Sequence, residues 1–262
     1  MLNPECMRIV IIGSGNIAHF FTPRLQENGH EIIQIFSPNP ENAKLLAEAN
    51  NIKHYTDDLG AITQDADAYI LAVKDDALKA LNEKLRFENK LVIHCAGAVA
   101  LDIIADISRK TAVIWTLYSI RKNNLPASNH IPLIVEANSD EALQGAEILA
   151  NAISDRVLTT SFEQRQLLHL NAVLVNNFTN HLLAIAEKLS GEHQLPFDIL
   201  KPIIEQTFSQ IQKVSPSESQ TGPAIRKDEV TMQKHLALLR EHEAWQQIYK
   251  DISTSIQQTI KK

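Results

Sequence analysis

Short apolar runs alternate with amphipathic stretches over residues 1–155. The runs are nearly unbroken, which is typical of strands that are buried on both faces of a parallel sheet. Their alternation with amphipathic stretches predicts βαβ units. The expected strands are residues 8–13, 31–37, 68–73, 90–95, 112–117 and 131–137, and the expected helices are residues 16–28, 40–50, 76–85, 100–108 and 140–153.

The pattern changes after Asp155, beyond which we expect no strand. Thr160 and Glu163 have the spacing of a capping box, so a helix should begin there. Residues 162–189 contain no Gly or Pro, which predicts one long helix. Further helices should follow residues 195–198 and fill residues 229–260. The predicted fold class is α/β: a doubly wound Rossmann-type parallel sheet (1–155), followed by an all-α C-terminal domain (156–262).

The first predicted strand runs into a G-x-G-x-x-A motif that opens a helix. In a dinucleotide site the first Gly makes the tight turn, the second lets backbone amides approach a pyrophosphate, and the third small residue packs helix on strand. The helix N-terminus adds a partial positive charge. Pro23 should kink or shorten this helix. The residues expected to bind the cofactor here are Gly13, Ser14, Gly15, Asn16 and Ile17, with Ala18 as the small residue.

The second predicted strand ends at Ser37, where an NAD-binding protein usually has an acidic residue for the ribose hydroxyls. That acid is missing. Ser37, Asn39 and Asn42 could donate hydrogen bonds to a 2′-phosphate, with Lys44 as a counter-charge. We therefore expect NADP rather than NAD as cofactor. The alternative is that this segment is an ordinary turn followed by a helix N-cap.

Two more segments follow predicted strands at the carboxyl edge of the sheet, where ligands bind in such folds. Ala72, Val73 and Lys74 should pass beside the ribose, and Ala96 with Gly97 should give the nicotinamide a close backbone approach. Lys74 and His94 are also candidates for catalysis. The competing interpretation is a surface lysine and a strand-end histidine without a chemical role.

The long predicted helix carries polar residues in an otherwise apolar context. His169, Asn176 and Asn180 are spaced by seven and four residues, which would place them on one helix face. They could be satisfied inside the core, or they could line a cleft. In the later loop, Arg226 could bind an anionic substrate or pair with Asp228. Asp228 or Thr231 could cap the next helix.

Five segments resemble a bacterial family that joins a Rossmann-like NADP-binding domain to a helical domain of unknown function. They are residues 9–18, 72–75, 94–97, 163–181 and 220–239, which together extend along nearly the whole chain. This family is similar to pyrroline-carboxylate reductases and related NADP oxidoreductases, whose helical domain often mediates dimerisation. The resemblance implies a fingerprint at Gly13, Gly15 and Ala18, a helix signature at His169, Asn177, Asn180 and His181, and a second signature at Thr221, Gly222, Pro223, Arg226, Asp228 and His235.

The chain departs from that family at two places. Members tend to have an aromatic–Pro–Leu/Met–Gln run where this chain has Trp115, Thr116, Leu117 and Tyr118. They also tend to have an Arg after the position of Ser37. The first departure concerns the substrate pocket, and the second concerns the strength of NADP binding.

Composition narrows the possible partners. The formal net charge is −6, so no basic field attracts nucleic acid. Two cysteines indicate neither a disulfide framework nor a zinc site, and we expect no metal. The apolar runs are too short to span a membrane, and the N-terminus lacks the layout of a signal peptide. We expect a cytoplasmic protein.

The leading hypothesis is an NADP-dependent oxidoreductase that acts on a small carbonyl or imine. His169 or Lys74 would donate the proton, and Asn177 would orient the substrate. Asn180, Arg226 and Asp228 are the expected substrate-binding residues, and the C-terminal domain should form a homodimer. One alternative is a non-catalytic NADP(H)-binding regulatory or sensor module. Another is a Rossmann scaffold that has lost its cofactor.

Overall fold

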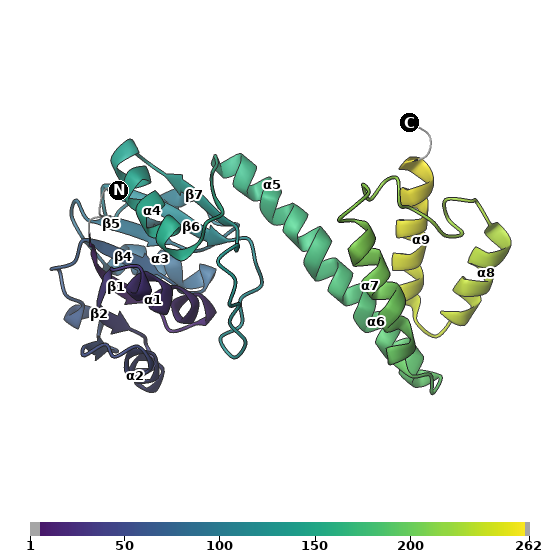
Figure 1. The fold of residues 1–262 in the computed structure, drawn as a ribbon, viewed down its shortest axis with the longest axis horizontal. Coiled ribbons are helices and arrows are strands. Elements are labelled where there is room, and N and C mark those ends of the chain that lie inside the picture. The colour runs from purple at the N-terminus through teal and green to yellow at the C-terminus, as the bar shows by residue number, and fades with distance from the viewer. Residues whose placement is uncertain (1–5, 260–262) are drawn as a thin grey trace. The chain divides into compact units, whose positions relative to one another are not determined.

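The computed structural model describes residues 6–259, which fall into two compact units with the division between Val175 and Asn176 (Figure 1). Each unit is described by itself. The division after residue 155, expected from the sequence, stays a prediction. No helix in residues 6–259 is long and apolar enough to cross a membrane.

The first unit is built on an eight-stranded sheet of order β3-β2-β1-β4-β5-β6-β7-β8. Neighbouring strands are parallel except β6 and β7, which are antiparallel. This sheet, followed by helices, confirms the predicted α/β class and Rossmann-type N-terminal domain. The strands are β1 (Arg8–Ile12), β2 (Glu31–Phe36), β3 (Tyr55–Thr56), β4 (Ala68–Leu71), β5 (Leu91–His94), β6 (Lys110–Thr116), β7 (Leu133–Ala137) and β8 (Val157–Thr159).

Helices cover both faces of the sheet, which explains the unbroken apolar runs. In β1, Ile9 and Ile11 join one buried cluster, whereas Val10 and Ile12 join the other, because successive side chains of a strand point to opposite faces. The first cluster includes residues of α1 (Asn16–Glu27), α2 (Pro40–Ala49) and α4 (Asp140–Ile153), and the second includes residues of α3 (Asp75–Lys84). Helix α1 continues past Pro23 to Glu27.

The structure differs from the sequence-based expectations for the first unit at four places. The helix expected at 100–108 is a short 3₁₀ turn, Leu101–Ile104, and another, Leu59–Ala61, was not foreseen. Strand β3 was missed. Strand β8 contradicts the expectation that strands stop after Asp155. Both missed strands are edge strands of two or three residues, too short to create a recognisable pattern.

Helix α5 (Phe162–Ala172) begins with a capping box one residue later than expected. The Ser161 hydroxyl accepts a hydrogen bond from the Gln164 backbone N–H at 3.3 Å, and the Gln164 side chain accepts one from the Ser161 N–H at 3.0 Å. The Thr160 hydroxyl makes no such bond and is buried without a partner. Either Gln or Glu can occupy the third helical position of a capping box, because both side chains supply an accepting oxygen. Gln164 therefore takes the position expected for Glu163.

The long helix expected at 162–189 is interrupted by a π-helical segment, Val173–Phe178. A π turn adds a residue to the α-helical repeat. The seven- and four-residue spacing of His169, Asn176 and Asn180 therefore no longer implies one helix face, and their common face stays a prediction. The remaining helices are α6 (Thr179–Glu192), a 3₁₀ turn (Phe197–Leu200), α7 (Lys201–Gln210), α8 (Glu229–Leu238) and α9 (Glu243–Thr259). The helical character expected for residues 229–260 is thus supplied by α8 and α9, and residue 260 lies outside the described residues.

Candidate functional site

The glycine turn after β1 brings three strand ends together. Gly13 has a φ of +123°, and its N–H donates to the Phe36 carbonyl at the end of β2 at 2.7 Å. A methyl group on Gly13 would lie 2.2 Å from the Ala72 carbonyl oxygen, just beyond β4. Both the backbone angle and the close approach require glycine here. The predicted cofactor segments at 13–17 and 72–74 are thus adjacent.

The N-terminus of α1 carries no side chain that would compete with an anion. Gly15 occupies the N-cap position without a capping hydrogen bond, and the first turn contains no acidic residue. By contrast, α2 is capped by Asn39 and α4 by Ser139. Free N–H groups and the helix dipole at α1 therefore favour a phosphate. Ile17 is half-buried and packs against the core.

The end of β2 is linked to the glycine turn through two hydroxyl groups. Ser14 Oγ and Ser37 Oγ lie 2.8 Å apart, and Ser37 is buried. The Asn39 side chain accepts from the Asn42 N–H at 3.1 Å, so the N-cap interpretation of this residue is confirmed. Residues 37–39 contain no carboxylate. Whether Ser37 and Asn39 contact a cofactor stays a prediction.

Asn16 has a partner that the sequence did not reveal. Its side-chain Oδ1 accepts from the Lys122 backbone N–H at 3.0 Å, which fastens the connection between β6 and β7 to the start of α1. Arg24 donates to the Pro126 carbonyl and fastens the same connection further along the helix. Burial and then the Lys122 charge lower the pKa of His19. No spacing rule connects residues 106 positions apart in sequence, so this contact could not be predicted.

The segment after β5 packs against the predicted proton donor. A methyl group on Gly97 would lie 2.5 Å from Trp115 Cε2 and 2.9 Å from His169 Cδ2. The Trp115 and His169 rings are 5.5 Å apart at 47°. Gly97 therefore leaves room for the side chains of Trp115 and His169, and its close approach to a nicotinamide stays a prediction. Ala96 is buried beside it.

The other two catalytic candidates at this edge, Lys74 and His94, differ in their exposure to solvent. Lys74 is exposed at the N-cap position of α3. His94 is completely buried, and burial, followed by the Arg165 charge, lowers its pKa to about 3, although a backbone hydrogen bond at Ala100 opposes this. His94 is therefore neutral at neutral pH. Its Nδ1 accepts from the Ala96 N–H at 3.2 Å, which favours a structural role.

Next to His94 lies Cys95, which is buried, and burial raises the pKa of its thiol. The other cysteine, Cys6, is exposed. The two cysteines therefore differ sharply in reactivity, because the thiolate is the reactive form. The Cys95 thiol is therefore protonated at neutral pH.

Arg165 is the residue that sequence reasoning missed at this edge. Its side chain is fully buried, and its Nε donates to Glu136 of β7 at 2.9 Å. Its remaining nitrogens donate to three backbone carbonyls in residues 96–99 at 2.7–3.0 Å. Two signals point to it in the sequence. Arg165 lies one helical turn before His169, and Glu136 lies in an otherwise apolar strand.

Predicted substrate residues of the second unit are exposed or serve as caps. Asn177, Asn180 and Arg226 are exposed. Asp228 caps α8 by accepting from the Thr231 N–H at 3.0 Å and the Thr231 hydroxyl at 2.7 Å. These bonds, and then the Arg226 charge, hold the pKa of Asp228 below its usual value. The capping role of Asp228 is confirmed, and its role in substrate binding stays a prediction.

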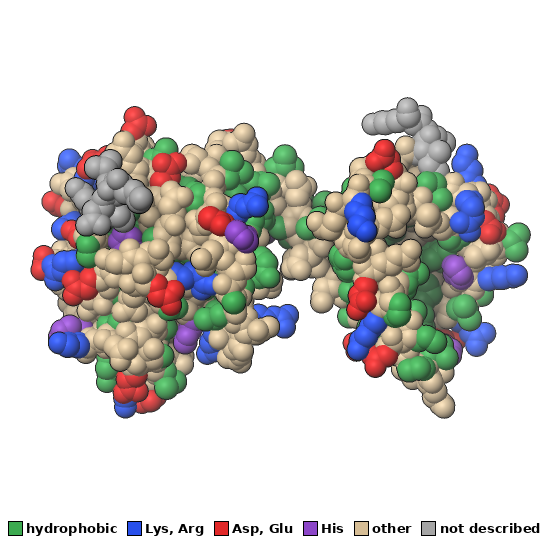
Figure 2. Space-filling model, in the orientation of Figure 1, with side chains coloured by type: hydrophobic (Ala, Val, Ile, Leu, Met, Phe, Trp, Pro, Cys, Tyr) green, Lys and Arg blue, Asp and Glu red, His purple; other side chains and the backbone are tan. Residues whose placement is uncertain are grey.

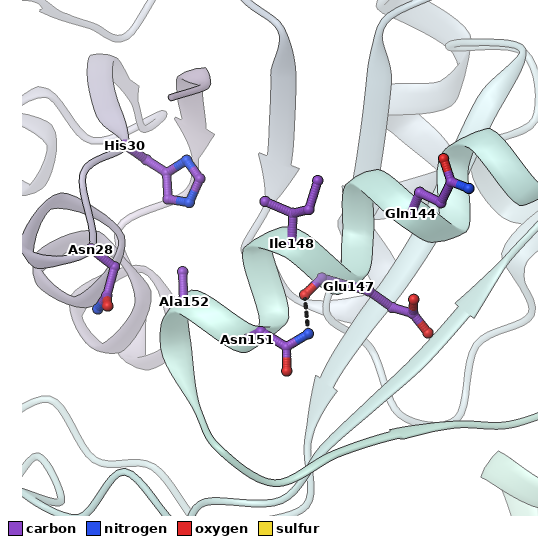
Figure 3. Close-up of a pocket in the computed structure, with 7 residues that line it drawn as sticks. All are labelled: Asn28, His30, Gln144, Glu147, Ile148, Asn151 and Ala152. Atoms are coloured by element: carbon purple, nitrogen blue, oxygen red, sulfur yellow. Dashed lines mark hydrogen bonds between the residues drawn. The ribbon is translucent and has the colours of Figure 1, made fainter. Parts of the chain in front are cut away.

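A pocket of about 560 Å³ lies at the opposite edge of the sheet, before β2 begins (Figure 3). Its residues come from the turn between α1 and β2 and from α4: Asn28, His30, Gln144, Glu147, Ile148, Asn151 and Ala152. Burial lowers the pKa of His30, and its buried Nε2 has no hydrogen-bond partner. None of the residues predicted from the sequence lies here. Ligands of such folds bind at the carboxyl edge, so the glycine turn remains the candidate site.

Comparisons with known protein families identify both parts of the chain. Residues 8–97 match the family described as NADP oxidoreductase coenzyme F420-dependent. Residues 131–256 match the domain of unknown function DUF2520. A comparison with curated proteins found no match.

Solved structures resemble the chain along nearly its whole length. A Bacteroides fragilis protein proposed to be an NADP oxidoreductase is 33% identical, with a TM-score of 0.87 over 97% of this chain and 99% of that one. A Thermotoga maritima protein is 21% identical, with a TM-score of 0.80 over 97% of this chain and all of that one (100%). The 1-pyrroline-5-carboxylate reductase of Streptococcus pyogenes is 16% identical, with a TM-score of 0.65 over 95% and 99% of the two chains. The last two likenesses show the fold alone.

Proposed function

We propose an oxidoreductase function from one premise: the chain belongs to the family that joins an F420-dependent-type NADP oxidoreductase domain to DUF2520. The proposed reaction is NADP-dependent transfer of a hydride to or from a small carbonyl or imine. The observation that carries this proposal is the packing of His169 against Gly97 and Trp115, at the sheet edge where the glycine turn lies.

The residues of this edge fit a dinucleotide. Gly13 leaves no room for a methyl group beside Ala72, and α1 begins without a side-chain cap or an acid. Backbone N–H groups at residues 14–17 would hold the pyrophosphate. Ala72, Val73 and Lys74 would lie beside the ribose, and Ala96 with Gly97 beside the nicotinamide. When bound, the cofactor supplies the hydride, and the protein supplies position and a proton.

We assign the role of proton donor to His169. Its ring is half-buried and within contact distance of Gly97 in the segment proposed to face the nicotinamide. A histidine can hold or release a proton near neutral pH, as a general acid requires. Lys74 is the second candidate, since its exposed ammonium follows β4 at the same edge. Asn177 is proposed to orient the substrate.

NADP is proposed over NAD from the absence of a carboxylate in residues 37–39. An acid at this position would accept hydrogen bonds from the ribose hydroxyls of NAD and repel a 2′-phosphate. The hydroxyl of Ser37 and the backbone of Asn39 carry no such charge. Asn180, Arg226 and Asp228 are proposed to bind the substrate, and the exposed Arg226 guanidinium suits a carboxylate.

A homodimer formed through the second unit is part of the proposal. Hydrophobic side chains reach the surface of this unit in Figure 2. The observation that supports a partner is the number of large apolar side chains left exposed there. They include Leu182, Leu195, Ile199, Ile203, Phe208, Val230 and Leu238.

The proposed reaction is tested by titration followed by a substrate screen. NADPH should bind more tightly than NADH, as measured by nicotinamide fluorescence. Small oxo acids and cyclic imines are then screened for NADPH oxidation. On any substrate found, His169→Ala should lower kcat by about 100- to 10,000-fold, the usual contribution of a general acid. The control is His54→Ala, which removes an exposed histidine of the same unit.

The outcomes separate the candidates. If His169→Ala keeps its turnover and Lys74→Ala loses it, Lys74 rather than His169 is the proton donor. Tight NADPH binding without oxidation of any substrate would favour the regulatory module. Failure of the wild-type protein to bind NADPH would contradict the proposal and indicate a scaffold without cofactor.

A further inference from the structure

We infer that Arg165 is a positioning residue, which holds residues 96–99 in the conformation that receives the nicotinamide half of the cofactor. Arg165 touches neither cofactor nor substrate in this role; it acts through the backbone of that segment. The inference rests on the proposed function, because it takes residues 96–99 as the part of the site that contacts the nicotinamide. We call this segment the nicotinamide wall.

The guanidinium of Arg165 is almost fully hydrogen-bonded within the protein. One guanidinium donates four hydrogen bonds, to Glu136 Oε2 and to the carbonyls of Ala96, Gly97 and Val99. The Phe162 ring lies 5.2 Å from its central carbon. A planar group with five N–H donors at fixed angles can serve these acceptors at once, whereas an ammonium on a flexible stem cannot.

Packing alone does not explain a charge at this place. Removing a guanidinium from water is costly, and an apolar side chain of similar volume often stabilises a protein equally well. An apolar side chain could not satisfy three carbonyls, which would be left buried without partners. Arg165 therefore specifies one backbone conformation of residues 96–99. Glu136, itself mostly buried, balances the charge.

The same helix turn connects this segment to the proton donor. Arg165 and His169 are separated by four residues of α5, so they lie on the same face of that helix. The guanidinium binds the carbonyl of Gly97 at 2.7 Å, and the imidazole packs against Gly97. Arg165 thus sets the position of the nicotinamide wall relative to His169.

The test compares two ligands that share the adenosine half. NADPH contains the nicotinamide, whereas adenosine 2′,5′-bisphosphate lacks it. The variants are Arg165→Lys, which keeps the charge but not the planar fork, and Glu136→Gln, which keeps an accepting oxygen. The control is Glu141→Gln, which removes the acid of an exposed ion pair with Lys110 in the same unit. Circular dichroism and thermal unfolding establish that each variant is folded.

We expect Arg165→Lys to weaken NADPH binding by about tenfold or more, since buried carbonyls lose their partners and the wall shifts. Binding of adenosine 2′,5′-bisphosphate should stay within about twofold of wild type. Glu136→Gln should also weaken NADPH binding, but by less. If Arg165→Lys does not fold, the comparison of the two ligands in Glu136→Gln tests the inference in its place. Glu141→Gln should leave both ligands unaffected.

Three results would overturn the inference. One is wild-type NADPH binding by both Arg165→Lys and Glu136→Gln. Another is an equal loss for the two ligands, which would make Arg165 a general structural residue. The third is a wild-type protein that binds both ligands with equal strength, so that the nicotinamide half has no contact to lose. A wild-type protein that binds neither ligand would instead contradict the proposed function.

Discussion

Gly97 shows at the level of a single residue why the segment after β5 tolerates little change. The missing side chain is replaced in space by the Trp115 indole and the His169 ring. The sequence predicted a close approach at this glycine, but it assigned the approach to a ligand alone. The neighbours that crowd it come from β6 and α5, and only the tertiary fold brings them together.

A methyl group at this position should therefore disturb both rings. We expect Gly97→Ala to lower the free energy of unfolding by about 1–3 kcal/mol, the usual cost of overpacking, and to weaken NADPH binding. Urea unfolding and fluorescence titration measure the two effects. Gly191→Ala is the matched control, since a methyl group there meets nothing within 4 Å in α6. Wild-type stability of Gly97→Ala would contradict the packing described.

His94 should make stability depend on pH. Its pKa in the folded protein is about 3, below the value of 6.5 expected in the unfolded chain. Between these values the unfolded state binds the extra proton, so the free energy of unfolding should fall as pH falls from about 6.5 towards 3, by at most about 1.4 kcal/mol per pH unit from this group.

The contribution is isolated by comparing urea unfolding of wild type and His94→Asn between pH 7 and 4. Asn retains an acceptor for the Ala96 N–H but does not titrate. Its stability should change less steeply with pH than that of wild type. Parallel pH profiles for the two proteins would show that His94 is not the group responsible.

At the scale of elements, Asp228 has one role that the structure shows and one that is proposed. Asp228→Ala should lower the free energy of unfolding by about 1 kcal/mol, the typical cost of losing an N-cap. Asp228→Asn should cost less, because its amide oxygen still accepts from the Thr231 N–H. Urea unfolding tests both.

Asp228→Asn also separates the two roles in activity. A raised KM in this variant, with stability near wild type, would support substrate binding by the carboxylate. An unchanged KM would leave Asp228 as a cap alone. If Asp228→Asn lost as much stability as Asp228→Ala, the hydrogen bond to the Thr231 N–H would not be the stabilising contact.

Elements with continuous apolar runs could be predicted from the sequence, and those without could not. The buried β1, β4 and β5 were found because both faces are covered and their positions are apolar apart from Arg8 at the start of β1 and His94 at the end of β5. Strand β8 was missed because its three residues lie at the sheet edge, with Leu158 exposed. The π segment at 173–178 has no sequence signature, since apolar residues and paired asparagines also suit an α-helix.

At the scale of the whole molecule, the sequence predicted the glycine turn of the candidate site but not the Arg165 cluster. The fingerprint at residues 13–18 follows a local rule, in which one turn meets one ligand. The Arg165 cluster joins α5, β7 and the segment after β5, across separations of 29 to 69 residues. No local spacing encodes such a contact, although an Arg one turn before a candidate histidine was a usable hint.

The proposed dimer gives a prediction for the assembled protein. Ile203→Glu should convert the dimer to a monomer, because a charge in a buried apolar interface is left unpaired. Sedimentation velocity measures the change. Leu45→Glu is the control, since Leu45 is similarly exposed on α2 of the first unit and should leave the dimer intact. A wild-type protein that sediments as a monomer would contradict the proposal.

The difference in exposure between Cys6 and Cys95 makes Cys6 a site for selective labelling with a dye. Cys6 is exposed, and Cys95 is buried and protonated. A maleimide dye should therefore react with Cys6 alone in the native protein, without any engineered cysteine. Two populations labelled with donor and acceptor dyes would then report subunit exchange by energy transfer on mixing, and denaturation before labelling should expose the second thiol.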